Sequence, residues 1–399
     1  MPLNADTLAD YTAYCTRLLS EGYSLYSSNQ IGENRFATYV TDRVELHLMW
    51  YASLSSLRIV YATRGYLPAQ TAPVYTKLME STVAQSAREA MTYAAAGESY
   101  VVQLEDGSFV IIDGGPGKEA DVTALMDWLT AHKPEADSKP RVTWMFTHLH
   151  NDHMELPVAF LKKYYAAIDL QTVCYNFPRL GTEDGLNDQL CTNNYNSLRS
   201  VLASHFSNTD IYVFHSGQKM YLPGCEIEFL FTQEDYWPQK FPTANHTSSA
   251  WRMTFTGGKT FMVLGDCEYG LCVQMASVYG DYLKSDVLQL SHHGLNGACL
   301  ELYQVIDPKV CFWPLDEYRM MNDGRALGLY AQTTDKGYSY TNYAANPDKT
   351  TVWEAYRFNY WLRNTQWTRG SESGERSHYH NSTTVGNWYQ KSKNSQRIK

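Results

Sequence analysis

Hydrophobic positions at the start of the chain change from a helical spacing to a strand spacing. Residues 5–20 repeat apolar side chains along one side of a helix: Leu8, Tyr11, Cys15, Leu18 and Leu19. The runs ENRFATYVT, VELHLMWYA and SSLRIVYAT follow, each short, rich in β-branched and aromatic residues, and bounded by polar breaks. Such runs are typical of an antiparallel meander. The pattern therefore predicts a small α+β unit over residues 1–94.

The spacing changes again from residue 97. ESYVVQLEDGSFVIIDGG predicts two strands around the Asp106–Gly107 turn, because Asp-Gly is a strong hairpin signal. A helical stretch over residues 118–133 follows, and the apolar run RVTWMFTH predicts a buried strand that ends at a group of histidines. In α/β folds, a strand, a helix and a second strand follow one another in this order, and polar functional residues commonly lie in the loop after the second strand.

Further strands follow with few helices between them. IYVFHSGQKMYLPGCEIEFLFT predicts two or three strands, WRMTFTGGKTFMVLGD predicts a hairpin, and SDVLQLSHHG predicts a strand that ends on histidines. We therefore expect an α/β domain over residues 95–325, with two packed mixed sheets flanked by helices. Residues 326–399 form an extension whose Tyr and Trp content argues against complete disorder, and we expect only its last ~30 residues to be flexible.

Composition and charge restrict the class of protein. The 399 residues are 44% hydrophobic and carry a net charge of −9, and no basic run typical of nucleic-acid binding occurs before the extreme C-terminus. An anionic substrate would thus have to be met by local groups such as metal ions. The N-terminus lacks a secretory pattern, the eight cysteines include no C-x-x-C pair, and no apolar stretch is long enough to span a membrane. We expect a cytoplasmic protein that is not bound to a membrane.

The stretch THLHNDHMEL, residues 147–156, concentrates candidate chemistry. It places His148, His150, Asp152 and His153 within six positions. Imidazole and carboxylate groups together suit zinc, manganese or iron, and a loop at a strand end can turn them toward two neighbouring points. A polar loop without a metal is the alternative, which this stretch alone does not exclude.

Further candidate ligands lie at other predicted strand ends. Asp266 ends the run FMVLGD, His292 and His293 follow VLQLS, and His246 precedes WRMTFT. Each of them alone would be interpreted as structural, but their joint occurrence favours a metal site.

Other histidines are interpreted as structural or surface residues. His47 alternates within a predicted strand, His215 lies in VFHSGQKM, and His378 and His380 lie in the polar C-terminal region. A single histidine in such a position more often completes a core or a surface than binds a metal.

These motifs resemble the metallo-β-lactamase superfamily over about residues 97–315. The resemblance lies in T-H-x-H-x-D-H after one strand, G-D after a second, a histidine after a third, and the hairpin that ends in Asp113. Asn245 and Ser248 before the G-D strand, with the sequence SHHG at 291–294, resemble the branch of competence-type DNA-uptake hydrolase domains and phosphorylcholine esterases. The resemblance implies an αββα sandwich.

The resemblance also implies a dinuclear metal centre. His148, His150 and His246 would hold one ion, Asp152, His153 and His292 would hold the other, and Asp266 would bridge the two.

Two of these assignments depend on choices that the sequence leaves open. His292 is preferred over His293 as the inner ligand, and His293 would then be a proton donor or support a ligand. Whether His246 completes the first site is also open. Asp113 is expected to orient a ligand, and Asp152 is expected to orient the nucleophile as well as bind metal.

The implied cofactors are two divalent ions, with zinc preferred and manganese or iron compatible. Relatives with a redox function have a glutamate at the position of His150, and the principal β-lactamases have a cysteine at that of Asp266, so hydrolysis is favoured. We expect a metallo-hydrolase of the phosphodiesterase type, which uses a metal-bridging hydroxide on a nucleotide, nucleic acid or phosphorylated small molecule. The candidate leaving-group acids are His293, Tyr175 and His215.

Two alternatives remain at the level of sequence. The first is hydrolysis of a lactone, thioester or amide bond, which the G-H-T-like His246 favours slightly. The second is a non-catalytic interaction protein that the metal stabilises. The N-terminal unit carries no chemical motif and could cover the site or form a dimer, so the oligomeric state stays open.

Overall fold

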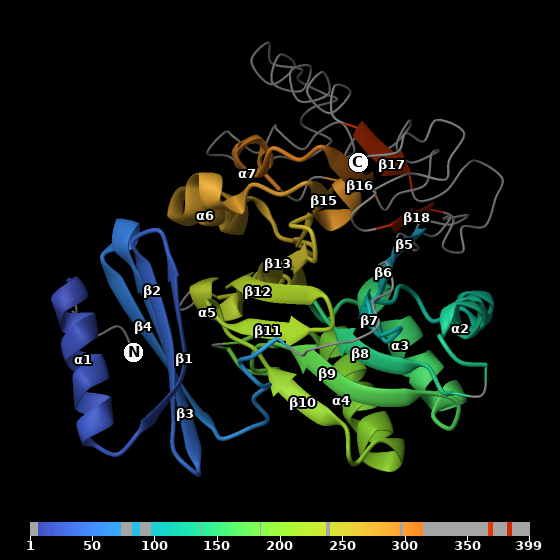
Figure 1. Ribbon diagram of the computed structural model, residues 1–399, viewed down its shortest axis with the longest axis horizontal. Coiled ribbons are helices and arrows are strands. Elements are labelled where there is room, and N and C mark those ends of the chain that lie inside the picture. Colours follow the sequence, from blue (N-terminus) through green and yellow to red (C-terminus); the bar gives the residue numbers. More distant parts are fainter. Residues whose placement is uncertain are drawn as a thin grey trace.

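The computed structural model describes residues 7–72, 82–87, 97–136, 138–183, 185–236, 240–295, 298–313, 366–369 and 381–384. These residues form one four-stranded sheet and two seven-stranded sheets. The four-stranded sheet lies to one side of the two larger sheets (Figure 1).

The N-terminal unit is a helix on an antiparallel meander. Helix α1 (Leu8–Ser20) begins with a capping box between Thr7 and Asp10, and it buries Tyr11 and Leu18 against the sheet. The strands are β1 (Ser24–Ile31), β2 (Asn34–Val40), β3 (Val44–Tyr51) and β4 (Ser56–Thr63). The predicted helix and three predicted strands are confirmed, while β1 was not predicted.

The first large sheet has the order β10-β9-β8-β7-β6-β5-β18. Its strands are β5 (Thr82–Ala87), β6 (Glu98–Gln103), β7 (Phe109–Asp113), β8 (Arg141–Met145), β9 (Asp169–Tyr175), β10 (Asp210–Val213) and β18 (Asn381–Thr384). The predicted hairpin is confirmed, because β6 and β7 pair antiparallel. From β7 to β10 the strands are parallel, because each is joined to the next by a helix: α2 (Glu119–His132), α3 (Asn151–Tyr164) and α4 (Gln189–His205).

The second large sheet has the order β11-β12-β13-β14-β15-β16-β17. Its strands are β11 (Lys219–Leu222), β12 (Cys225–Phe231), β13 (Ala250–Phe255), β14 (Thr260–Val263), β15 (Val287–Gln289), β16 (Val310–Trp313) and β17 (Gln366–Arg369). The associated helices are α5 (Gln233–Tyr236), α6 (Tyr269–Tyr279) and α7 (Leu300–Ile306). Four 3-10 turns complete the described elements: η1 (Ala52–Leu54), η2 (Ala244–Thr247), η3 (Gly280–Leu283) and η4 (His292–Gly294).

Buried side chains define the layers. Tyr100 and Ile112 of the first sheet share one hydrophobic cluster with Phe229, Trp251 and Val263 of the second, so the two sheets pack face to face. A second cluster joins the first sheet to α2, α3 and α4, and a third joins the second sheet to α6 and α7. The predicted architecture of two mixed sheets flanked by helices is confirmed.

The N-terminal sheet packs against the second large sheet through both apolar and polar contacts. Phe36 and Tyr51 belong to the hydrophobic cluster that contains α6. Arg58 donates a hydrogen bond to the backbone carbonyl of Asp235, and the buried carboxylate of Asp235 accepts from the Tyr51 hydroxyl and, at 2.8 Å, from the backbone nitrogen of Thr232. The N-terminal unit is thus fixed by buried groups of the sandwich.

Two segments of the predicted C-terminal extension form edge strands. Strand β17 pairs parallel to β16, and β18 pairs antiparallel to β5. The predicted domain boundaries at residues 94 and 325 stay predictions, and His378 and His380 lie outside the described residues. Within the described part of the chain, no helix is long and apolar enough to cross a membrane.

Gly217 provides a test of how the N-terminal sheet is docked. It has a φ of +84°, and an added Cβ would lie 2.0 Å from Cγ of Phe36. We expect Gly217→Ala to lower the free energy of unfolding by about 2–4 kcal/mol, from the left-handed backbone and the overpacking together. The measurement is urea unfolding.

The matched control is Gly257→Ala. Gly257 has a φ of +88°, but no atom lies within 4 Å of an added Cβ, so only the backbone cost of about 1–2 kcal/mol applies. Equal destabilisation by both substitutions would contradict close packing of Phe36 on Gly217.

Candidate metal centre

The sequence THLHNDH spans the junction between β8 and α3. Strand β8 ends at Met145, and α3 begins at Asn151 with His150 in extended backbone as its N-cap residue. Asp152 and His153 therefore lie in the first helical turn, where a carboxylate interacts favourably with the helix dipole. The sequence predicted a loop here, and the helix is an addition that the structure makes.

Asp113 at the end of β7 fixes the position of this junction. Its carboxylate is fully buried and accepts hydrogen bonds from the Thr147 backbone nitrogen at 2.9 Å and the Thr147 hydroxyl at 2.6 Å. It also lies 2.9 Å from Nδ1 of His153. The pairing directs Nε2 of His153 toward Asp266, whose Oδ1 is 3.3 Å away. Asp113 thus orients one imidazole toward the centre.

Asp266 lies between the histidines. It follows Gly265, where an added Cβ would lie 2.7 Å from Cβ of Thr147, so the two strand-end loops approach closely. Its Oδ2 is 3.8 Å from Nε2 of His148 and 3.5 Å from Nε2 of His293. Its backbone nitrogen donates to Oγ of Ser248 at 3.1 Å. The two carboxylate oxygens therefore face different histidines.

His148 lies against Asp266, with His150 next to it. Nε2 of His148 lies 3.1 Å from Nδ1 of His150, and His148 is fully buried. His150 also faces Asp188 and Cys191, with one candidate ligand atom of each within 4.8 Å of the others. His150 therefore lies between the inner cluster and the start of α4.

His293, rather than His292, faces the carboxylates. Nε2 of His293 is 3.3 Å from Oδ2 of Asp152, and Nδ1 is 3.7 Å from Oε2 of Glu98. Nε2 of His292 instead lies 3.4 Å from Nδ2 of Asn245. Both histidines have positive φ, 52° and 57°, and these consecutive left-handed residues turn the second side chain inward. This arrangement is the reverse of the expected order of the pair.

The described contacts do not bring His246 to His148 or His150. Its Nδ1 lies 3.1 Å from the Thr243 hydroxyl and 3.3 Å from Oε2 of Glu268. The 3-10 turn η2 buries Asn245 and leaves the side chain of His246 partly exposed beside Glu268. The expected third ligand of the first ion therefore lies at the edge of the cluster.

Of the three candidate leaving-group acids, one lies in the centre. His293 contacts Asp152 and Asp266, whereas the ring of Tyr175 stacks on Phe177. His215 stacks on His47 under the N-terminal sheet.

Sequence reasoning missed Glu98, Asp188 and Glu268. Glu98 is fully buried at the start of β6, and burial raises its pKa to about 8. Its position in the apolar run ESYVVQ gave no chemical signal, because its partner His293 is distant in sequence. Glu268 is two residues after Asp266, and Asp188 begins α4, so only the fold connects them to the histidines.

The ionisable groups of the cluster strongly shift one another's pKa values. Burial lowers the pKa of His153, but Asp266 and Asp113 outweigh burial and hold this pKa well above its usual range. Burial also lowers the pKa of His293, which Asp266 and Asp152 nevertheless raise to about 10. For Asp266, burial acts to raise the pKa, yet His153 and His293 hold it well below its usual range. Buried carboxylates here are stabilised by positive charge.

The donor atoms fit divalent cations. Buried atoms without a hydrogen-bond partner among the described residues include Nε2 of His153, Oδ1 of Asp266 and Nε2 of His293. An unsatisfied buried polar group costs about 1–3 kcal/mol, and imidazole with carboxylate is a ligand set for zinc, manganese or iron. A cation would satisfy these atoms, supply the balancing positive charge, and release protons from the histidines.

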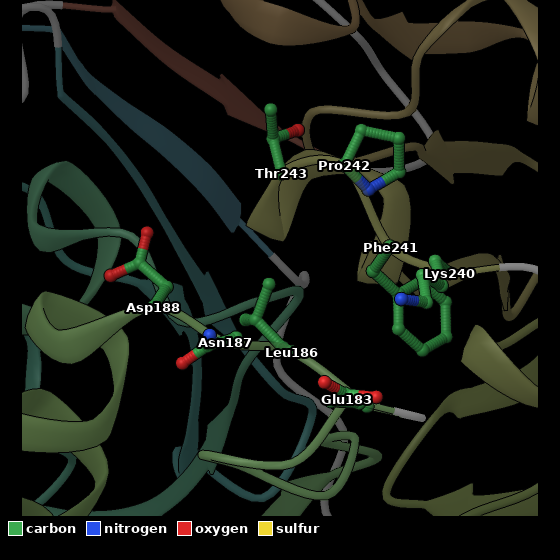
Figure 2. Close-up of a pocket in the computed structure, with 9 residues that line it drawn as sticks. Glu183, Leu186, Asn187, Asp188, Lys240, Phe241, Pro242 and Thr243 are labelled. Carbon is green, nitrogen blue, oxygen red and sulfur yellow. The ribbon is translucent and has the colours of Figure 1, made fainter.

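A cavity of about 250 Å³ opens beside the cluster. Figure 2 shows it between two segments, 183–188 and 240–243. Asp188 at this cavity groups with His150, and Thr243 contacts His246, so two of its lining residues adjoin histidines at the edge of the cluster. Its lining combines charged, polar and apolar side chains: Glu183, Gly185, Leu186, Asn187, Asp188, Lys240, Phe241, Pro242 and Thr243.

No family model and no curated protein matches the sequence. Solved structures are similar at low identity. The metallo-β-lactamase fold protein YhfI from Bacillus subtilis is 13% identical, with 58% of this chain and 85% of that chain covered and a TM-score of 0.36.

Two longer solved proteins are also similar. CmlA, a diiron β-hydroxylase from Streptomyces venezuelae, is 11% identical with a TM-score of 0.39, over 77% of this chain and 54% of that one. A long form RNase Z from yeast is 10% identical with a TM-score of 0.39, over 80% of this chain and 49% of that one. This chain therefore spans about half the length of each of these two proteins.

The fold follows from the chain's own topology. Two mixed sheets face each other, helices cover both outer surfaces, and histidines and aspartates gather where β7, β8 and β14 end. The chain has an αββα sandwich fold, the architecture that the resemblance of its sequence motifs implies.

Proposed function

We propose that the protein is a metal-dependent hydrolase that holds two divalent cations and cleaves a phosphodiester of a nucleotide, nucleic acid or phosphorylated small molecule. One observation carries the proposal. Buried imidazole and carboxylate groups from three strand ends converge, and the atoms with which they face one another lack hydrogen-bond partners within the described chain. Such a group is suited to binding cations rather than to stabilising the core.

The distances support a division of the ligands around Asp266. His148, His150 and Asp266 would hold one cation, and Asp152, His153 and His293 would hold the other, with Asp266 shared. Bound cations of this kind make a water molecule acidic and stabilise negative charge on substrate oxygens.

The chain's own residues orient the two inner imidazoles. Asp113 lies behind His153, and Glu98 lies behind His293, so each ring has a carboxylate at Nδ1 and turns Nε2 toward the centre. Asp152 lies at the mouth of the first helical turn and is a quarter exposed, so it can accept a hydrogen bond from the attacking water. A defined ring orientation is what a metal ligand requires.

The cavity supports an anionic substrate with an apolar part. Among the lining residues that the structure describes, Lys240 is the one basic residue, and Leu186 and Phe241 provide apolar surface. Glu183 and Asp188 would repel a phosphodiester unless cations compensate for them, which makes binding of such a substrate dependent on the metal. Zinc as the native metal is part of this proposal, since the ligands accept it readily.

Removal of metal should abolish turnover. We expect chelation to eliminate hydrolysis of bis-p-nitrophenyl phosphate, and addition of zinc or manganese to restore it, because the cations supply both nucleophile activation and charge stabilisation. The measurement is the initial rate together with elemental analysis, which should give at least about two metals per chain. If metal is bound but no phosphodiester is hydrolysed, lactones, thioesters or amides become the proposed substrates. If no metal is bound, the proposal is overturned.

Substitution of the shared carboxylate should have a large effect. Asp266→Asn is expected to reduce turnover by at least about 10²–10³-fold and to lower metal content, because both cations lose a charged ligand. Far-UV circular dichroism should remain near that of the original protein. The control is Asp281→Asn, since Asp281 has a side chain that is 82% exposed. Turnover by Asp266→Asn equal to that of the control would exclude a dinuclear centre at this place.

The histidine pair distinguishes the two ligand assignments. His293→Gln is expected to lose about one metal per chain, whereas His292→Gln should retain the full count, because Nε2 of His293 lies within 3.3 and 3.5 Å of Asp152 and Asp266, while Nε2 of His292 lies beside Asn245. Inductively coupled plasma mass spectrometry of the two purified variants gives the count. Loss of metal from His292→Gln alone would restore the assignment that the sequence favoured.

A further inference from the structure

A second group of buried metal-ligating side chains lies where the N-terminal sheet meets the sandwich. Glu45 and His47 are on β3, and His215 is in the turn between β10 and β11. Their exposed fractions are 4%, 2% and 2%, and the two imidazole rings are stacked with centroids 3.6 Å apart. This group shares no residue with the candidate metal centre.

Three ligand atoms of the group have no partner. Nε2 of His47, Nε2 of His215 and Oε2 of Glu45 are buried and make no hydrogen bond with any described residue. One nitrogen or oxygen from each side chain lies within 4.8 Å of the other two. A well-packed core seldom leaves three such atoms together, because each loses its hydration without replacement.

The opposite side of each imidazole is supported by other polar groups. Nδ1 of His47 lies 3.2 Å from the Thr38 hydroxyl, and Nδ1 of His215 lies 3.1 Å from Oε1 of Glu234. Asn176 donates to both carboxylate oxygens of Glu234 and holds it in place. A carboxylate at Nδ1 that leaves Nε2 free is the arrangement found behind metal-binding histidines.

We propose that Glu45, His47 and His215 bind a divalent cation, with zinc as the best match, and that this ion joins the N-terminal sheet to the sandwich. Two imidazoles and one carboxylate are a recognised zinc ligand set. Tetrahedral ligands of zinc are about 3.4 Å apart; Nε2 of His47 lies 3.9 Å from Oε1 of Glu45, and the two stacked rings would have to tilt apart for a nitrogen of each to meet the same ion. The ligands come from both sides of the junction, so the ion crosslinks them.

The test uses the full chain with the first centre disabled by His148→Asn and Asp266→Asn. After chelation and re-addition of zinc, we expect about one zinc per chain to remain and the melting temperature to rise with zinc. X-ray absorption at the zinc edge should show two imidazole ligands and oxygen. If the protein with His148→Asn and Asp266→Asn binds no zinc, the proposal is overturned, whether or not the unsubstituted chain hydrolyses phosphodiesters.

Further substitutions in this background locate the ion. His47→Asn or His215→Asn should abolish the remaining zinc and the melting shift, whereas His205→Asn, on the exposed end of α4, should change neither. Glu45→Gln preserves the size of the side chain and should weaken zinc binding at least 10-fold, which keeps the test decisive if a histidine variant does not fold. Retention of zinc by all three junction variants overturns the proposal.

Discussion

The candidate metal centre depends on the buried carboxylate of Asp113. It accepts two hydrogen bonds from Thr147 and lies against Nδ1 of His153, so one side chain at the end of β7 determines both the path of the loop after β8 and the direction of an imidazole on α3. Asp113 itself has a φ of 51°, a left-handed conformation that costs about 1–2 kcal/mol in a non-glycine residue. Such a conformation persists when surrounding contacts over-determine it, and three contacts to one carboxylate do so here.

Close approach of backbone from the two sheets brings the remaining ligands to this point. The Ser249 nitrogen donates to the Thr147 carbonyl at 3.0 Å, and the His292 nitrogen donates to the Gly265 carbonyl at 3.1 Å. The first bond links the loop after β8 to the segment before β13, and the second links the turn after β15 to the loop after β14. Gly265 permits the approach because a larger residue would meet the side chain of Thr147. The ligand geometry is therefore a property of backbone pairing between strand ends, and flexible side chains complete it.

The sequence predicted the features that depend on residues close together in the chain. Alternating apolar runs gave the β6–β7 and β13–β14 hairpins, and the spacing in THLHNDH gave the group of candidate ligands. It did not predict α3, because the polar group and the internal Pro157 obscure the helical period. The order of the histidine pair depends on two left-handed residues, and the importance of Glu98 depends on a contact 195 residues away along the chain (98 to 293). Such features arise only when distant segments meet.

One physical arrangement recurs at three places in the molecule. Asp113 lies against His153, Glu98 against His293 and Glu234 against His215, and in each pair the carboxylate is on the Nδ1 side. In all three, Nε2 of the histidine is buried and has no hydrogen-bond partner among the residues that the structure describes, and Nδ1 of His293 and of His215 makes only an ion-pair contact with its carboxylate. A histidine that only completed a core would be satisfied at both nitrogens, because an unpaired buried donor or acceptor is costly. A histidine that binds a cation needs one ring nitrogen directed at the ion without a hydrogen-bond partner, and a polar group beside the other nitrogen to fix the orientation of the ring. The same criterion that identifies ligands in the candidate metal centre therefore also selects His215 at the junction with the N-terminal sheet, a residue that the sequence indicated only as structural or as a leaving-group acid.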